Sequence, residues 1–360
     1  MNQPTKSKLN VGRAVDWEFA ATVGARLARP GPATTDYTHR QAIDQLTEAA
    51  RSSELPVRDV TGLIESGEIP EARIVDRPEW IRAATKSMRV MTGGSQKDGD
   101  KDGAKPGIIS GRITGAQTGA VLAFISSGIL GQYDPFGPDG GELLLVYPNV
   151  IAVERQLRVQ PADFRLWVCL HEVTHRVQFR ANPWLAEHMS RSLAVLTEET
   201  GDDVSEVVGR LAEFVRVSRN GADGAAPQPN TTGMVGLLRA VQSEPQRKAL
   251  DQLLVLGTLL EGHADHVMDA VGPKVVPSVT TIRRRFDERR QRKQPPLQRV
   301  MRALLGFDAK LSQYTRGKAF VDQVVSQVGM ARFNTVWSGP ETLPLPTEID
   351  EPQRWIDRVL

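Results

Sequence analysis

The sequence has one cysteine, almost no net charge and no long hydrophobic run, and each shortage excludes a class of protein. Cys169 is the only cysteine among 360 residues, so no intrachain disulfide can form, which fits a reducing compartment. The 45 basic residues nearly balance the 43 acidic residues and leave a net charge of +2. The overall charge therefore gives no indication of a nucleic-acid or membrane partner.

Neither a membrane span nor an export signal is visible. The most apolar stretch, residues 119–130, is shorter than the ~20 residues that a membrane-spanning helix needs. The N-terminal stretch up to Phe19 lacks the apolar core and cleavage site of a secretory signal. We therefore expect a cytoplasmic protein that binds neither membrane nor nucleic acid.

Most of the chain has the apolar periodicity of helices. Helices are expected over residues 15–28, 38–53, 77–91 and within 113–130. From Pro161 onward the chain should be almost entirely helical, whereas residues 142–149, ELLLVYPN, form the one clear strand pattern. Ser243, followed three residues later by Gln246, predicts a capping box that opens a helix extending to about Val271. These patterns predict a mainly α fold with a small β element (α+β).

One apolar helix carries an unusual set of polar residues. In LWVCLHEVTHRVQF, residues 166–179, His171 and His175 lie about 40° apart at 100° per residue, so they share one face. Two imidazoles one turn apart can bind a single metal ion. Glu172 lies about 100° away, too far round to ligate with them but within reach of a water on the metal. This H-E-x-x-H spacing predicts a zinc hydrolase, with two structural histidines in a core as the alternative. Cys169 should face the core and be inert.

A third ligand is expected from a second cluster, LLEGHADHVMD, residues 259–269. On a helical wheel Glu261 and Asp265 share a face, while His263 and His266 point away from it by more than about 100°. Glu261 is therefore favoured as the third ligand over His263. Asp265 would accept the outer N–H of a ligating histidine. An ordinary pair of carboxylates is the alternative, and the two histidines would then serve in packing or in supporting hydrogen bonds.

The order of these segments resembles a known family. HEVTH followed by EGHAD looks like the gluzincin pattern, and segments from about Val15 to Leu360 resemble actinobacterial and chloroflexal zincin-like proteins described as zinc-dependent metalloproteases or hydrolases. One branch of that family is associated with coenzyme F420 biosynthesis. The resemblance implies a zincin-like core, one bound Zn2+ ion, and the roles that its motifs assign to this chain: the ligands His171, His175 and Glu261, and the base Glu172.

The leading hypothesis is a zinc-dependent metallopeptidase in which Glu172 activates a zinc-bound water that attacks a peptide carbonyl of a peptide or protein substrate. A zinc hydrolase of a small non-peptide molecule, and a zinc-containing binding or regulatory protein without turnover, remain as alternatives. The chain would comprise an N-terminal helical region (1–92), a flexible loop (93–107) and a zincin-like catalytic region that ends in a helical part (108–360).

Three other segments have candidate roles. Residues 142–149 precede the HEVTH helix, as the peptide-binding edge strand of zincins does, although a purely structural strand is an equal alternative. The basic run at 283–293 could bind an acidic partner, but a solvated helix face is the simpler interpretation. Tyr314, Arg316 and Lys310 could stabilise an oxyanion or hold a substrate carboxylate, with packing or surface pairing as the alternative.

Overall fold

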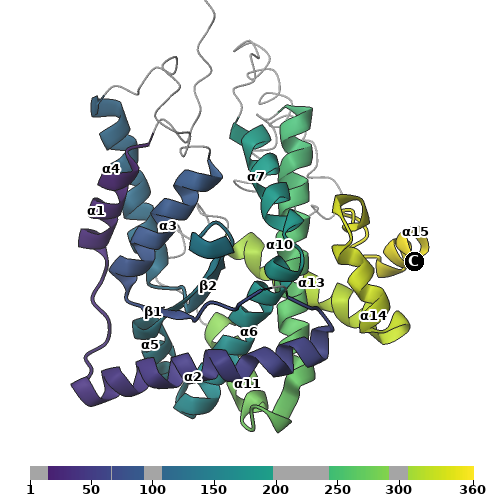
Figure 1. The fold of residues 1–360 in the computed structure, drawn as a ribbon, viewed down its shortest axis with the longest axis horizontal. Coiled ribbons are helices and arrows are strands. Elements are labelled where there is room, and N and C mark those ends of the chain that lie inside the picture. Colours follow the sequence, from purple (N-terminus) through teal and green to yellow (C-terminus); the bar gives the residue numbers. More distant parts are fainter. Residues whose placement is uncertain (1–14, 66, 93–107, 198–242, 292–306) are drawn as a thin grey trace, which may run out of the picture.

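The computed structural model describes residues 15–65, 67–92, 108–197, 243–291 and 307–360 (Figure 1). Helices surround a small sheet, and short 3-10 turns occur at Pro138–Gly140, Gly272–Lys274, Asn334–Trp337 and Pro340–Thr342. The helices are α1 (Trp17–Leu27), α2 (Asp36–Thr61), α3 (Arg77–Met91), α4 (Ile108–Ser126), α5 (Tyr147–Leu157), α6 (Pro161–Ala181), α7 (Trp184–Thr197), α10 (Glu244–Val271), α11 (Val279–Gln291), α13 (Phe307–Val328), α14 (Met330–Phe333) and α15 (Pro352–Val359), and the strands are β1 (Arg73–Val75), β2 (Gly131–Asp134) and β3 (Glu142–Val146).

The sheet has the order β1-β3-β2, with β1 parallel and β2 antiparallel to the central strand β3. Strand β3 is buried on both faces, as expected for a continuous apolar run. Leu143 and Leu145 belong to the core that contains α6, whereas Leu144 and Val146 belong to a second core formed with α3 and α4. The sheet therefore separates α6 from α3 and α4.

Strand β2 follows the same alternation. Tyr133 faces α6, with its ring centroid 5.8 Å from that of Phe179. Gln132 faces the other way, and its Oε1 accepts a hydrogen bond of 2.9 Å from Nε1 of Trp80 on α3. These contacts fix β2 between α3 and the helix that carries the two motif histidines.

Two expectations about strands are corrected. Residues 142–149 were expected to form an edge strand, but β3 is central, and the chain turns into α5 at Tyr147, with Pro148 in its first turn. The edge strand next to α6 is β2, which lies outside the one expected strand segment. Apart from Tyr133 its residues have little strand propensity, so pairing with the apolar strand β3, which follows it closely in the chain, makes them extended.

Most helix expectations are confirmed. Helix α10 ends at Val271 as expected, and Gln246 Oε1 accepts a 3.1 Å hydrogen bond from the backbone N–H of Ser243, one half of the predicted capping box. Helix α2 is longer than expected, because it continues through Pro56 to Thr61. Val57, just beyond that proline, is fully buried, and burial of this kind contributes ~1.5–3 kcal/mol, which offsets much of the ~3 kcal/mol that a proline inside a helix costs.

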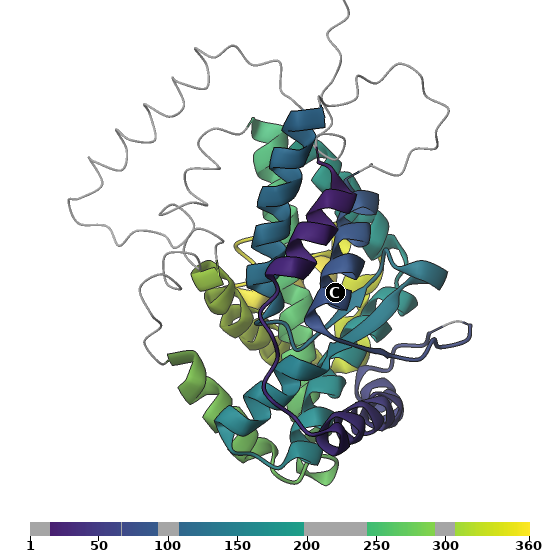
Figure 2. The same cartoon turned by 90° about the vertical axis from the view of Figure 1, so that its left-hand side faces the viewer.

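Helix α6 occupies the middle of the fold, in contact with α2, α10 and the sheet (Figure 1). The other view shows α1, α3 and α4 on the opposite side of the sheet (Figure 2). A third core joins α7, α10 and α13 to the C-terminal elements, around the fully buried Trp355. The predicted loop 93–107 lies outside the described residues, and the segments before and after it share the sheet through β1 and β3. Across the described residues, no helix is both long and apolar enough to cross a membrane.

Candidate metal centre

Helix α6 presents its two histidines from a rigid position. Leu170, Val173 and Val177 on its opposite side are fully buried in the core. Each such side chain stabilises the helix position by ~1.5–3 kcal/mol relative to exposure. The rings of His171 and His175 stand nearly perpendicular, with centroids 4.7 Å apart. Their side chains remain 20% and 14% exposed, so the face that they share is accessible.

Glu261 on α10 meets both histidines. Nε2 of His171 lies 3.2 Å from Nε2 of His175 and 3.2 Å from Oε2 of Glu261, and the remaining distance, from His175 Nε2 to Glu261 Oε2, is 3.7 Å. Donor atoms that bind one tetrahedral ion at ~2.0–2.1 Å lie roughly 3.3 Å from one another. The three atoms thus have the spacing of a metal site. Among the described residues, no other three histidine, cysteine or acidic side chains converge in this way.

The hydrogen bonds of Gln178 determine which nitrogen of His175 is free. Gln178 Nε2 donates to the carbonyl of Leu260 at 3.0 Å, so its amide oxygen must be the atom that faces His175. That oxygen lies 2.9 Å from His175 Nδ1, which therefore carries a proton and donates it. In the neutral ring Nε2 is then unprotonated, with its lone pair directed at His171 and Glu261. Lone pairs that converge in this way can be donated to one bound cation.

The protonation states of His171 and Glu261 depend strongly on each other. Burial opposes protonation of His171, but the hydrogen bond and charge of Glu261, with smaller contributions from Glu172 and Asp265, raise its pKa to about 9. Burial likewise opposes ionisation of Glu261, yet the two imidazoles hold its pKa well below the usual range. Oε2 of Glu261 is buried, and the groups that it faces are the two imidazole nitrogens at 3.2 and 3.7 Å. An anionic oxygen in this state is suited to a metal ion.

The expectation for Asp265 is not met. Its carboxylate oxygen lies 3.5 Å from Nη1 of Arg283, and the outer nitrogen Nδ1 of His171 lies 3.3 Å from the sulfur of Met268. The guanidinium of Arg283 also pairs with Asp269 at 2.7 Å, so one cation faces both carboxylates. Gln178 on α6, and not Asp265, is the residue that accepts the outer N–H of a motif histidine.

Glu172 lies on the neighbouring face of α6 and packs against the edge strand. It is 7% exposed. A Cβ atom placed on Gly131 would lie 2.6 Å from Cγ of Glu172 and 2.9 Å from Cδ, so the glutamate side chain occupies the space that any other residue at position 131 would need. The carboxylate is close enough to His171 to raise the pKa of that histidine. Glu172 therefore covers the α6-facing side of β2 at Gly131 and also lies near His171.

His263 and His266 lie away from the cluster, as the helical wheel predicts. His263 is fully buried against Phe333, and its Nδ1 accepts a 2.9 Å hydrogen bond from Gln178 Nε2, so it supports the same amide that orients His175. Burial lowers the pKa of His263 to about 3, with the nearby His266 and His175 adding to the shift. His266 pairs instead with Asp322 on α13 at 2.7 Å.

The remaining candidates have other surroundings. Arg316 makes a bidentate ion pair with Asp350, and the side chains of Tyr314 and Lys310 lie outside the described residues. Of the basic run, Arg285 donates to the backbone at the end of α5 and Arg289 to Gln156, so these arginines hold α11 against α5. Cys169 is fully buried, and burial raises the pKa of its thiol.

Residues that the sequence did not indicate also shape the site. Gln178 follows His175 by three positions and so lies on the same helix face, a signal that was available. Gly131 gave no signal, because its requirement arises from the approach of α6. Gly262 and Gly317 allow α10 and α13 to touch: a Cβ on Gly262 would lie 2.1 Å from the carbonyl carbon of Gly317. This crossing is adjacent to Glu261.

Comparison with known proteins identifies the family of the chain. Residues 15–356 match the profile of the zincin-like metallopeptidase family. The chain belongs to that family. A crystal structure from Chloroflexus aurantiacus, of a protein described as a candidate hydrolase with a novel fold, superposes with a TM-score of 0.64 at 28% sequence identity, covering 96% of this chain and 98% of that one. No curated protein matches the chain significantly. Membership of the zincin-like metallopeptidase family implies a metal-dependent hydrolase, and the His171, His175 and Glu261 cluster offers a place for the metal.

Proposed function

We propose that the protein is a zinc-dependent metallopeptidase of the gluzincin type. The observation that carries the proposal is the convergence of His171, His175 and Glu261, with all three ligand atoms within 4.8 Å of one another and Glu172 on the next face of the same helix. Two imidazoles and one glutamate form one of the donor sets that catalytic zinc sites use. Gln178, by accepting the proton of His175 Nδ1, keeps the inward nitrogen available.

The residues around the cluster have the arrangement that amide hydrolysis needs. Zinc, when bound, lowers the pKa of water and polarises a substrate carbonyl. Glu172 is the general base: it accepts the proton of the attacking water and then delivers it to the leaving amine. Its position against Gly131 restrains the carboxylate, so little rotamer freedom is lost when the substrate arrives.

The edge strand β2 supports a peptide as the substrate. Leu130 O accepts a 2.8 Å hydrogen bond from Val146 N, so alternate residues pair with β3, and the backbone groups of Gly131 and Tyr133 point away from it. Within the described residues, no strand pairs with this side of β2. An extended peptide that adds to this edge would pass next to Glu172. This observation favours a peptidase over a hydrolase of a small non-peptide molecule.

Metal analysis and an activity screen test the proposal together. The purified protein should contain one zinc per chain, and the His171→Ala/His175→Ala variant should contain none. With a quenched fluorescent peptide library, Glu172→Gln should retain zinc but lose hydrolysis by ~10²–10⁴-fold, the usual contribution of a general base. Glu187→Gln, a change in an exposed surface ion pair, should behave as wild type.

Other results would point to the two alternatives. Zinc that persists in the double histidine variant would show that the metal is bound elsewhere. Peptides that stay intact while small amides or esters are cleaved in a Glu172-dependent manner would indicate a non-peptide hydrolase. Full zinc occupancy without any hydrolysis would indicate a binding or regulatory protein.

A further inference from the structure

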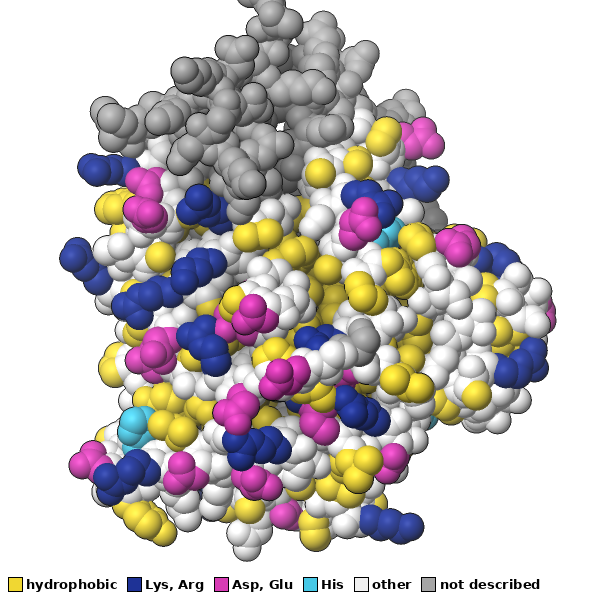
Figure 3. Space-filling model, in the orientation of Figure 1, with side chains coloured by type: hydrophobic (Ala, Val, Ile, Leu, Met, Phe, Trp, Pro, Cys, Tyr) yellow, Lys and Arg dark blue, Asp and Glu magenta, His cyan; other side chains and the backbone are white. Residues whose placement is uncertain are grey.

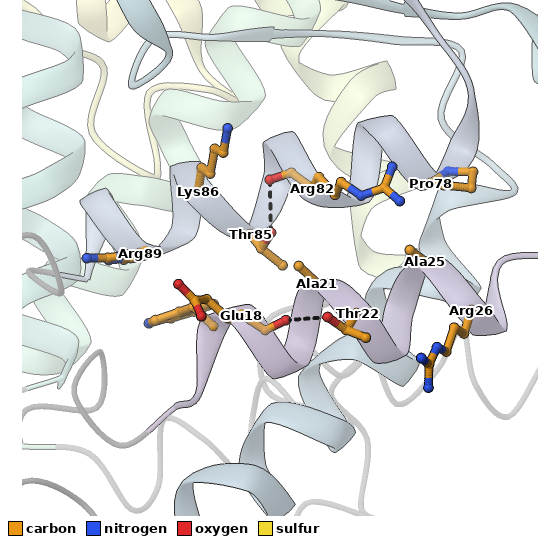
Figure 4. Close-up of a pocket in the computed structure, with 11 residues that line it drawn as sticks. Glu18, Ala21, Thr22, Ala25, Arg26, Pro78, Arg82, Thr85, Lys86 and Arg89 are labelled. Atoms are coloured by element: carbon orange, nitrogen blue, oxygen red, sulfur yellow. Dashed lines mark hydrogen bonds between the residues drawn. The ribbon is translucent and has the colours of Figure 1, made fainter.

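A groove of about 590 Å³ lies between α1 and α3, outside the candidate metal centre (Figure 4). The two helices run antiparallel and touch where Gly24 faces Ile81, since a Cβ on this glycine would lie 2.8 Å from the Ile81 side chain. All eleven residues that line the groove come from these helices. The groove is therefore elongated along two straight walls.

The floor of the groove favours an apolar partner. It contains Ala21, Ala25 and Pro78. The hydroxyl of Thr22 already donates to the carbonyl of Glu18 at 2.9 Å, and that of Thr85 to the carbonyl of Ile81 at 3.0 Å. Small side chains with satisfied hydroxyls let another helix approach closely but offer it no hydrogen bond.

The rim of the groove is cationic. Arg82, Lys86 and Arg89 recur on one exposed face of α3 at intervals of about one turn, a row of roughly 10 Å, and Arg26 stands on the α1 wall. Arg26, Arg82 and Lys86 make no ion pair or side-chain hydrogen bond within the described part of the chain. Glu18 is the single acidic residue in the lining. The groove is thus strongly positive although the whole chain is nearly neutral.

We propose that this groove binds an acidic amphipathic helix of a partner protein. Figure 4 shows Arg82, Lys86 and Arg89 spread along α3 and directed apart, so no compact anion can contact all of them. A helix with carboxylates at i, i+4 and i+7 matches their spacing. Nucleic acid fits less well, because Trp17 is the only aromatic residue in the lining and the apolar floor would stay unmatched.

Exposed apolar residues near the two ends of the groove also suit an amphipathic partner helix. Leu27 follows Arg26 and is 55% exposed, and Val90 follows Arg89 and is 44% exposed. An amphipathic helix has leucine or alanine beside its acidic stripe, and such residues complement these side chains and the floor between them. The groove is separate from the metal ligands, so binding here is independent of the proposed peptidase activity.

Fluorescence polarisation with defined probes tests the proposal on the full chain. The first probe is a labelled helical peptide of about 14 residues, with glutamates at i, i+4 and i+7 and alanine or leucine beside them. A second peptide has the same composition but glutamates on all faces. A single-stranded oligonucleotide of similar charge and vesicles containing phosphatidylglycerol serve as competing polyanions.

The expected result is binding of the first peptide at least about tenfold tighter than the other probes, weakened about tenfold or more by Arg82→Glu/Lys86→Glu and by added salt. The matched control, Arg247→Glu/Lys248→Glu, reverses two exposed cations at the start of α10 and should change the affinity by less than about twofold. Circular dichroism confirms that both variants are folded. Equal binding by the two double variants, or tighter binding of the permuted peptide, the oligonucleotide or the vesicles, would overturn the proposal.

Discussion

The side chain of Glu172 lies directly on Gly131, so closely that a Cβ on the glycine would be 2.6 Å from Cγ of the glutamate. One residue belongs to the helix with the H-E-x-x-H motif and the other begins the edge strand. The contact therefore sets the distance between the proposed base and β2, the strand beside which a peptide substrate would lie.

Alanine at position 131 should impair catalysis without removing the metal. Gly131→Ala must push the Glu172 carboxylate aside, and a displacement of about 1 Å in a reacting group can cost ~10²-fold in rate. Peptidase kcat should fall by about that factor, while zinc content by elemental analysis stays at one per chain. Gly128→Ala is the control, since a Cβ there meets only the Ile125 carbonyl at 3.6 Å. Equal activity of the two variants would contradict this account of Glu172.

Gln178 should contribute to metal affinity through His175. Gln178→Leu removes the acceptor of the His175 Nδ1–H, and loss of such a partner typically weakens metal binding by ~10–100-fold. Chelator-competition titration measures the effect. Asp265→Ala serves as the comparison, because its carboxylate contacts Arg283 and no motif histidine, and it should lose less affinity. A larger loss in Asp265→Ala than in Gln178→Leu would reverse the assignment.

The crossing of α10 and α13 should tolerate no side chain at Gly262. A Cβ there would lie 2.1 Å from backbone atoms of Gly317, so Gly262→Ala must separate the helices, and overpacking of this kind costs ~1–3 kcal/mol. Gly257, on the same helix, has no atom within 4 Å of an added Cβ. Gly257→Ala should instead stabilise the protein by ~0.5–1 kcal/mol through helix propensity. Urea unfolding of both variants checks the opposite signs.

Cys169 should be unreactive in the folded protein. It is fully buried, and burial raises the pKa of the thiol, so the thiolate that reacts with alkylating reagents is scarce. Iodoacetamide should label less than a few per cent of the native chains under conditions that label all unfolded chains. Mass spectrometry before and after denaturant makes the comparison, and rapid labelling of the native protein would contradict the buried position.

The metal cluster could be predicted because it depends on local periodicity. His171 and His175 share a face wherever a helix forms, and the wheel separates Glu261 from His263 without any knowledge of packing. The partner of Asp265 could not be predicted in this way. Arg283 comes from another helix, α11, and the Asp265 carboxylate faces its guanidinium.

The sheet could be predicted only in part. The apolar run at residues 142–146 predicts a strand, and a run without polar alternation is typical of a strand buried on both faces, a signal for a central position that the expectation of an edge strand overlooked. In residues 131–134, Tyr133 favours a strand, but glycine and aspartate are uncommon in strands, so the segment has no clear strand pattern. These residues are extended because they pair with β3, which follows them closely in the chain.

The alternation along β3 has a mechanical consequence. Leu143 and Leu145 pack toward α6, while Leu144 and Val146 pack toward α3 and α4. A change of volume at Leu144 or Val146 is therefore felt first by α3, one wall of the groove, whereas the same change one residue along, at Leu143 or Leu145, is felt first by the helix that carries His171 and His175. Neighbouring positions of one strand thus transmit strain to opposite faces of the molecule.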